Sequence, residues 1–241
     1  MSGQVTISEH EGVRYLHLGS PWVQGAMRIS APQHLELEYV QQMMMWSLFN
    51  PAPKHIVQLG LGAGSLTRFC YDNFPESRVT TVELNPAVVR ACHVLFHLPP
   101  NNERLNVTIE CAEHYLAHVQ PESIEVLQVD LYNAESHAPA LQSAGFYEAC
   151  ARSLGKNGVL TVNLLGNELV HATNLHHLQS CFAAVAWLPE SHDGNIVAIA
   201  FKAAPQVDFD DLYDKALEIA KNYGLPARNW VDGLYAWMEQ E

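Results

Sequence analysis

The sequence predicts an α/β fold, in which a mainly parallel, Rossmann-like sheet of seven strands follows a small N-terminal β-rich segment. Two observations support this prediction. From residue 55 onward, strand-like and helix-like stretches alternate, which is typical of βαβ units. Near the C-terminal end, strand-like runs at 183–189 and 195–202 are joined by a segment whose Asp193-Gly194 pair favours an antiparallel hairpin.

Residues 1–50 are expected to form the β-rich segment and a connecting helix. This segment contains three strand-like runs, at residues 4–8, 13–18 and 22–30. Apolar residues then recur at helical spacing from Leu35 to Phe49, which predicts a single helix. Pro51 and Pro53 separate this helix from the main sheet, because proline interrupts regular structure.

Residues 51–204 are expected to form the Rossmann-like domain, and residues 205–241 a helical tail. The parallel strands of the domain are predicted at 56–59, 78–84, 105–110, 124–130 and 158–164. Its helices are predicted at 65–74, 86–97, 112–119, 138–154 and 168–182. The tail carries two further helical stretches, at 208–222 and 226–239.

A glycine-rich turn between the first parallel strand and its helix is the strongest functional motif. Gly60, Gly62 and Gly64 allow a sharp turn and let a ligand approach the main chain. Glu83 ends the next strand about 20 residues later, where nucleotide-binding folds place an acid against ribose hydroxyls. Strand, turn, helix and spaced acid together favour an adenosine-ligand site over a turn that is merely tight.

The composition excludes several classes of function. The 241 residues are 48% apolar and 16% charged, which describes a globular chain with a full core. The net charge of −13 disfavours a nucleic-acid partner, since such proteins neutralise phosphates with cations. The acidic charge could attract cationic substrates or could simply keep the protein soluble, and the sequence leaves both open. Five widely spaced cysteines without a CxxC pair indicate neither a disulfide framework nor a zinc site.

We find no targeting signal, membrane span or metal-binding motif in the sequence. The N-terminus has no basic region leading into an apolar stretch, and no run approaches the roughly 20 apolar residues of a membrane span, so we expect a cytoplasmic protein without a membrane partner. Two histidine pairs have i, i+4 spacing, His93 with His97 and His114 with His118, but neither has a third ligand nearby, and we predict no metal. The run Met43-Met44-Met45-Trp46 indicates either core or a contact in a possible homodimer.

The order of the motifs resembles the spermidine synthase superfamily, the polyamine aminopropyltransferases, over most of residues 13–165. The matching segments are Val23-Gln-Gly-Ala-Met-Arg28, Tyr39, the glycine turn, Val82 to Val89, Val129-Asp-Leu-Tyr-Asn133, and Phe146-Tyr147 to Asn163. The resemblance implies a class I methyltransferase fold. It also implies a transferase that uses S-adenosylmethionine or its decarboxylated form as co-substrate and passes an aminopropyl group to an amine, such as a polyamine.

The resemblance further implies roles for residues on the co-substrate side. Gln24 would reach the nucleoside from the β-rich segment, the three glycines would pack under the co-substrate, and Glu83 would hold the ribose hydroxyls. Cys111 and Ala112 fall where the family has an acid followed by alanine at the adenine.

On the acceptor side, Asp130 matches the acid thought to deprotonate the amine, and Tyr39 and Asn133 match positions in the acceptor pocket. A protonated amine is not a nucleophile, so a carboxylate that accepts its proton would free the lone pair for attack on a sulfonium carbon. From its position alone, Asp130 could instead be a helix cap or a solvated loop acid. Glu135 could supply a second carboxylate or lie on the surface.

Several positions depart from the family pattern. Ala63 stands where the aminopropyltransferases carry an acid in the glycine turn, and Asn133 replaces a second acid. The turn acid suits a co-substrate without a carboxylate, because it would repel one. Val40 replaces a polar residue, and Cys111 replaces the acid at the adenine, for which Glu110 or Glu113 could substitute. Methyl transfer to an unidentified acceptor and nucleoside binding without turnover therefore remain as alternatives.

Overall fold

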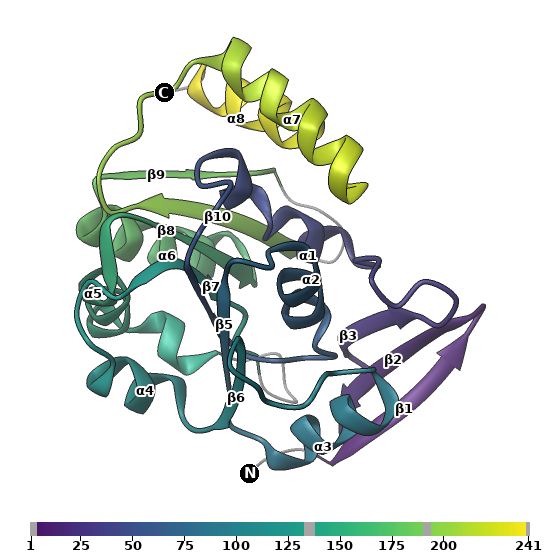
Figure 1. The fold of residues 1–241 in the computed structure, drawn as a ribbon. Coiled ribbons are helices and arrows are strands. Elements are labelled where there is room, and N and C mark those ends of the chain that lie inside the picture. The colour runs from purple at the N-terminus through teal and green to yellow at the C-terminus, as the bar shows by residue number, and fades with distance from the viewer. Residues whose placement is uncertain (1–3, 133–137, 190–193, 240–241) are drawn as a thin grey trace.

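Two sheets organise the chain in the computed structural model, which describes residues 4–132, 138–189 and 194–239 (Figure 1). The smaller one is antiparallel and is formed by β1 (Val5–His10), β2 (Val13–Leu18) and β3 (Val23–Arg28). The turn between its first two strands is tighter than predicted, because Glu11 and Gly12 both adopt the left-handed conformation, with φ values of 48° and 75°.

The larger sheet has seven strands in the order β6-β5-β4-β7-β8-β10-β9. They are β4 (His55–Leu59), β5 (Arg78–Glu83), β6 (Leu105–Ile109), β7 (Ile124–Val129), β8 (Leu154–Leu165), β9 (Ala184–Trp187) and β10 (Asn195–Phe201). The five strands from β6 to β8 run parallel, and β10 pairs antiparallel with both β8 and β9. The predicted sheet and its terminal antiparallel pair are thus confirmed. The predicted hairpin turn at Asp193 falls outside the described residues.

Helices cover both faces of the larger sheet (Figure 1). One face is covered by α2 (Ser65–Asn73), α3 (Pro86–Leu95), α7 (Phe209–Tyr223) and α8 (Ala227–Met238). The other face is covered by α4 (Ala112–His118), α5 (Ala144–Ser153) and α6 (Glu168–Cys181). Successive side chains of β4 point to opposite faces of the sheet. Ile56 packs in the apolar cluster on the first face, and Val57 packs in the cluster on the second. Within the described residues, no helix is both long and apolar enough to cross a bilayer.

The single helix predicted from Leu35 to Phe49 is wrong. The segment contains the short helix α1 (Glu38–Gln42) followed by the 3-10 turn η1 (Met45–Leu48). Its apolar side chains are buried on all sides, because Met43, Met44, Met45 and Trp46 are each 0% exposed, so they form core within the chain. The carbonyl of Met43 accepts hydrogen bonds from side chains of the sheet, and this use of its acceptor competes with a continuous helix.

The predicted helix at 138–154 is also divided. A 3-10 turn, η2 (Pro139–Gln142), precedes α5, and Ser143 between them has extended backbone angles. The strand predicted at 158–164 is longer than expected, because β8 begins at Leu154.

Buried amides tie α1 to the sheet and so place the segment that carries Tyr39. Gln58 of β4 donates to Gln128 of β7 at 2.8 Å, and Gln128 donates to the carbonyl oxygen of Met43 at 3.0 Å. Thr161 of β8 donates to the same carbonyl oxygen at 3.0 Å. Since a buried polar group without a partner is costly, these bonds fix where α1 can lie.

Candidate active site

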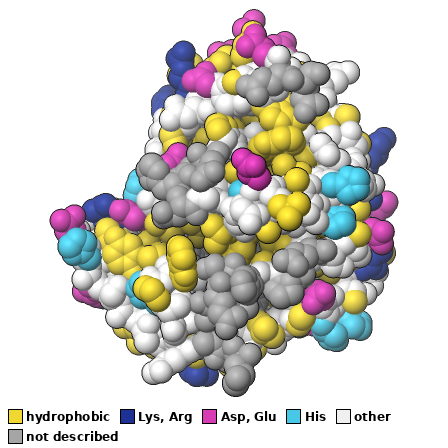
Figure 2. Space-filling view, turned by 180° about the vertical axis from the view of Figure 1, so that it is seen from behind, with side chains coloured by type: hydrophobic (Ala, Val, Ile, Leu, Met, Phe, Trp, Pro, Cys, Tyr) yellow, Lys and Arg dark blue, Asp and Glu magenta, His cyan; other side chains and the backbone are white. Residues whose placement is uncertain are grey.

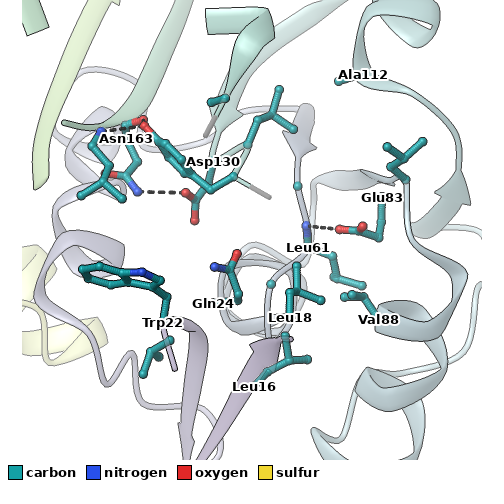
Figure 3. Close-up of a pocket in the computed structure, with 18 of the residues that line it drawn as sticks. Leu16, Leu18, Trp22, Gln24, Leu61, Glu83, Val88, Ala112, Asp130 and Asn163 are labelled. Carbon is teal, nitrogen blue, oxygen red and sulfur yellow. Dashed lines mark hydrogen bonds between the residues drawn. The ribbon is translucent and has the colours of Figure 1, made fainter. Parts of the chain in front are cut away.

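A cavity of about 830 Å³ lies at the carboxyl ends of β4, β5 and β7, where open parallel sheets place their sites (Figure 3). The small sheet closes it from the other side with side chains such as Leu16, Trp22 and Gln24. Figure 3 shows Asp130 on one side of the cavity and Glu83 on the other. The structure therefore brings Gln24, Tyr39, Gly60, Gly62, Glu83, Cys111, Ala112 and Asp130, which come from separate motifs, to the lining of one cavity.

The glycine turn forms the floor between these two carboxylates. Gly60 and Gly62 line the cavity and have left-handed φ values of 96° and 52°. A Cβ atom at Gly60 would lie 2.0 Å from the carbonyl oxygen of Asp130, and one at Gly62 would lie 2.6 Å from that of Gln24. Gly64, with φ of 70°, is the residue before α2 and lies outside the lining. Only glycine fits the first two positions, because both conformation and space exclude a side chain.

Glu83 braces the glycine turn while facing the cavity. Its Oε2 accepts from the backbone N–H of Leu61 at 3.1 Å, and its Oε1 accepts from that of Asn85 at 2.7 Å (Figure 3 shows the first bond). Burial raises the pKa of Glu83, and the backbone bonds offset part of this effect. A carboxylate has about four acceptor sites, so both oxygens can still accept from ligand hydroxyls.

Asp130 directly follows β7 and is held by side chains from distant parts of the chain. Asn163 of β8 donates through Nδ2 to Oδ1 at 2.9 Å, and the Tyr39 hydroxyl donates to Oδ2 at 3.4 Å. Burial raises the pKa of Asp130, while the bonds from Asn163 and Tyr39 lower it. Burial and the neighbouring carboxylate hold the pKa of Tyr39 well above its ordinary value, so this hydroxyl keeps its proton.

Three residues to which the sequence analysis gave no role complete this wall. The Tyr132 hydroxyl donates to the carbonyl oxygen of Asn163 at 2.9 Å and accepts from the backbone N–H of Leu165 at 2.6 Å. Asn195 of β10 donates through Nδ2 to Oδ1 of Asn163 at 2.7 Å. The available signal was Asn163, a polar residue in the mostly apolar run from Gly158 to Leu164.

Cys111 and Ala112 lie at the start of α4 and line the cavity beside Glu110 and Glu113. They thus reach the cavity from the side of β5 and β6, away from Asp130. His114 is hydrogen-bonded through Nδ1 to Glu110. The second histidine of this pair, His118, contacts the carbonyl oxygen of His114 through Nδ1 at 2.8 Å.

Within residues 4–132, 138–189 and 194–239, no group of three or more metal-ligating side chains gathers. His93, in the other pair, is hydrogen-bonded through Nδ1 to the carbonyl oxygen of Leu98 at 3.0 Å. These ring nitrogens thus have local partners.

Ala63 does not line the cavity. Its side chain is buried against β3, where a Cβ atom added to Gly25 would lie 2.5 Å from the Ala63 nitrogen and 2.7 Å from its Cβ. The small sheet therefore packs directly on the glycine turn. Asn133 and Glu135 lie outside the described residues, so their predicted positions stay predictions.

Acidic residues on the tail bear on the origin of the net charge. Figure 2 shows Asp and Glu side chains gathered at the top of the molecule, over the C-terminal helices. On α7 the exposed acids are Asp210, Asp211, Asp214 and Glu218, and they lie outside the cavity lining. This part of the net charge is therefore solvent-exposed and is not part of the candidate site.

No protein-family model matches the chain. It is 33% identical to the polyamine aminopropyltransferase of Neisseria meningitidis serogroup A over 236 residues, which cover 97% of this chain and 89% of the relative. It is 30% identical to the enzyme of the same name from Chromobacterium violaceum over 233 residues, covering 96% and 89% of the two chains.

Solved structures share the fold. The crystal structure of a probable spermidine synthase from Corynebacterium glutamicum superposes with a TM-score of 0.76 at 19% identity, covering 95% of this chain and 91% of that one. A spermidine synthase in complex with the transition-state analogue AdoDATO gives 0.67 at 15% identity, covering 91% and 79%. Human methyltransferase-like protein 13 in complex with SAH gives 0.70 at 20% identity, covering 78% and 93%. The class I methyltransferase fold expected from the sequence is thereby confirmed.

Proposed function

Because the chain belongs to the polyamine aminopropyltransferase family, we propose that it transfers an aminopropyl group from decarboxylated S-adenosylmethionine to the amine of a polyamine-like acceptor. One observation carries this proposal. A single cavity is lined both by the glycine turn with Glu83 and by Asp130 with Tyr39. The proposed nucleoside site and the partly buried carboxylate base therefore face the same cavity, as a transfer between two bound molecules requires.

In this proposal the co-substrate lies over the glycine turn. Glu83 accepts from the ribose hydroxyls, while its existing bonds to Leu61 and Asn85 hold it in place. Gln24 approaches from β3, and Cys111 with Ala112 flank the adenine. The absence of Cβ atoms at Gly60 and Gly62 lets the backbone at Asp130 and at Gln24 lie directly against the turn, which brings both walls of the cavity close to the nucleoside.

The chemical step places Asp130 beside the acceptor amine. The ionised carboxylate accepts a proton from the ammonium group, and the freed nitrogen lone pair attacks the propyl carbon bonded to the sulfonium sulfur. A carbon–nitrogen bond forms as the carbon–sulfur bond breaks, and its electron pair stays on sulfur, so a neutral thioether leaves. Tyr39 and Asn163 keep the carboxylate oriented through their hydrogen bonds.

Methyl transfer from S-adenosylmethionine is the second candidate, and Ala63 is the observation that favours it. The position where the family resemblance expects an acid carries a methyl group that packs against Gly25. Without a fixed negative charge there, a co-substrate carboxylate meets no repulsion from this residue. We therefore expect any preference for the decarboxylated form to stay below about 100-fold, which corresponds to about 2.7 kcal/mol.

Calorimetry followed by product analysis tests the proposal. The purified chain is titrated with S-adenosylmethionine, its decarboxylated form and methylthioadenosine, and then incubated with diaminopropane, diaminobutane and diaminopentane. We expect nucleoside binding and an aminopropylated diamine, detected by mass. A methylated product would instead establish the second candidate, and binding without any product would leave a nucleoside-binding protein. Failure of all three ligands to bind would overturn the nucleoside site itself.

A further inference from the structure

Asn195 lines the same cavity as Asn163 and lies one hydrogen bond further from Asp130. Its Nδ2 donates to Oδ1 of Asn163 at 2.7 Å, and Nδ2 of Asn163 donates to Oδ1 of Asp130 at 2.9 Å. The two asparagines lie on neighbouring antiparallel strands and are 9% and 2% exposed. The three side chains thus form a directional chain of hydrogen bonds from β10 through β8 to the end of β7.

The direction of this chain has a chemical consequence. A primary amide has a donor end and an acceptor end of nearly the same shape, so Asn163 could occupy its site in either orientation. Reversed, its carbonyl oxygen would face the Asp130 carboxylate and repel it. Because Asn195 presents an N–H to Asn163, only the orientation that turns the amide NH2 toward Asp130 satisfies both bonds.

We propose that Asn195 is a positioning residue for the transfer reaction, which fixes the amide orientation of Asn163 and thereby the hydrogen bond that Asp130 receives. The inference rests on the proposed function for its consequence on rate. The effect of Asn195 on the Asp130 carboxylate, two strands away, can be measured without turnover.

A test of this proposal must distinguish the titration of Asp130 from that of the other groups around it. Tyr39 faces it from α1, and Tyr132 follows it in the chain; both are titratable, and burial raises the pKa of each. Glu83 lines the same cavity from β5. From β8 and β10 the facing groups are the two amides, which do not titrate. The bond from Asn163 lowers the pKa of Asp130 against the opposing effect of burial, so its loss should raise that pKa.

The experiment follows the titration of Asp130 by the carbon-13 shift of its carboxyl carbon, with Asp130→Asn to assign the resonance. Asn195→Ala should move the midpoint to higher pH, and Asn195→Asp should move it further, because the new carboxylate attracts the NH2 of Asn163 and turns its carbonyl oxygen toward Asp130. Asn163→Leu removes the donor directly. The acidic limb of kcat/KM should move the same way, with a loss at neutral pH of about 3- to 10-fold for Asn195→Ala and 10- to 100-fold for Asn163→Leu.

Asn174→Ala is the matched control. This asparagine is also buried and accepts from Tyr147, but it lies on α6 outside the cavity lining, so its loss should lower Tm and leave the Asp130 titration unchanged. A wild-type titration and pH profile in folded Asn195→Ala would overturn the proposal, and so would an equal shift in the control. If the wild-type chain transfers nothing, the proposed function fails separately, and the carboxyl titration still decides whether Asn195 controls Asp130.

Discussion

Glu83 and Asp130 are both partly buried carboxylates at strand ends, and burial raises the pKa of each, but their partners differ in kind. Glu83 accepts from backbone N–H groups of the adjacent turn and of its own strand end. Asp130 accepts from side chains of Asn163 and Tyr39, which lie far away in the sequence. The donors to Glu83 are thus main-chain groups that remain after any substitution except proline, whereas the donors to Asp130 are side chains that a substitution can remove.

This difference suggests that the two carboxylates have different functions, with ligand binding at Glu83 and proton exchange at Asp130. A carboxylate fixed by main chain suits a constant ligand part, such as a ribose with two hydroxyls. A carboxylate held by side chains can be adjusted in pKa and direction, which suits a group that exchanges protons. The substitutions and pH measurements below test whether the two carboxylates have these different functions.

The largest effect is expected for Asp130→Asn. The amide cannot accept the ammonium proton, so kcat should fall about 10²- to 10⁴-fold, the usual contribution of a positioned acid or base. Co-substrate affinity should stay nearly unchanged, because Asp130 lies across the cavity from Glu83 (Figure 3). Single-turnover kinetics and calorimetry on the same preparation measure both quantities. Wild-type turnover by the folded variant would remove Asp130 from the mechanism.

Glu83→Gln should show the opposite emphasis. Its two carboxylate oxygens become one carbonyl oxygen, so hydrogen bonds to the ribose and to the turn weaken together. We expect the Kd for the co-substrate to rise about 10- to 100-fold, the range for losing a hydrogen bond to a charged group, while saturated turnover changes less. Calorimetry decides the matter. An unchanged Kd with reduced kcat would reverse the assigned roles of the two carboxylates.

Tyr39→Phe should have a smaller effect, because the bond it removes is long at 3.4 Å. Its loss should raise the pKa of Asp130 and lower kcat/KM at neutral pH by about 2- to 10-fold. Tyr213→Phe is a suitable control, since this hydroxyl donates to Asp232 on the tail at 2.6 Å. The pH–rate profiles of both variants provide the measurement. Equal profiles for the wild type and Tyr39→Phe would show that Tyr39 does not adjust Asp130.

The smallest expected effect concerns the pH dependence of stability. The folded-state pKa values of Asp130 and Glu83 are raised, so each contributes stability that is present below its unfolded pKa and is lost as pH rises through the folded value. At neutral pH, Asp130→Asn should therefore raise the free energy of unfolding by about 0.5–2 kcal/mol, the usual scale of one stabilising substitution. Denaturant unfolding at acidic and neutral pH checks this. A variant that is less stable at neutral pH would indicate that Asp130 mainly supports the structure.

The features that could be predicted from the sequence are those that local patterns determine. The glycine turn, its flanking strands and Glu83 were predictable because neighbouring residues determine the turn and the following strand end. Asn195 and Asn163 meet only through the antiparallel pairing of β10 and β8, which no local pattern reveals. The helix expected from Leu35 to Phe49 failed for a related reason, since contacts with the sheet override its helical spacing.

Because β3 packs directly on the glycine turn, ligand binding depends on the docking of the N-terminal sheet. Gly25 and Gly62 bring the two backbones so close that neither position has room for a Cβ atom. A nucleoside held between Gln24 and Glu83 would bind only chains in which the small sheet is docked, and by mass action it would stabilise that docking. Protection of residues 4–28 from proteolysis would therefore increase with co-substrate concentration, so this small sheet would report occupancy of a site whose other residues lie much later in the sequence.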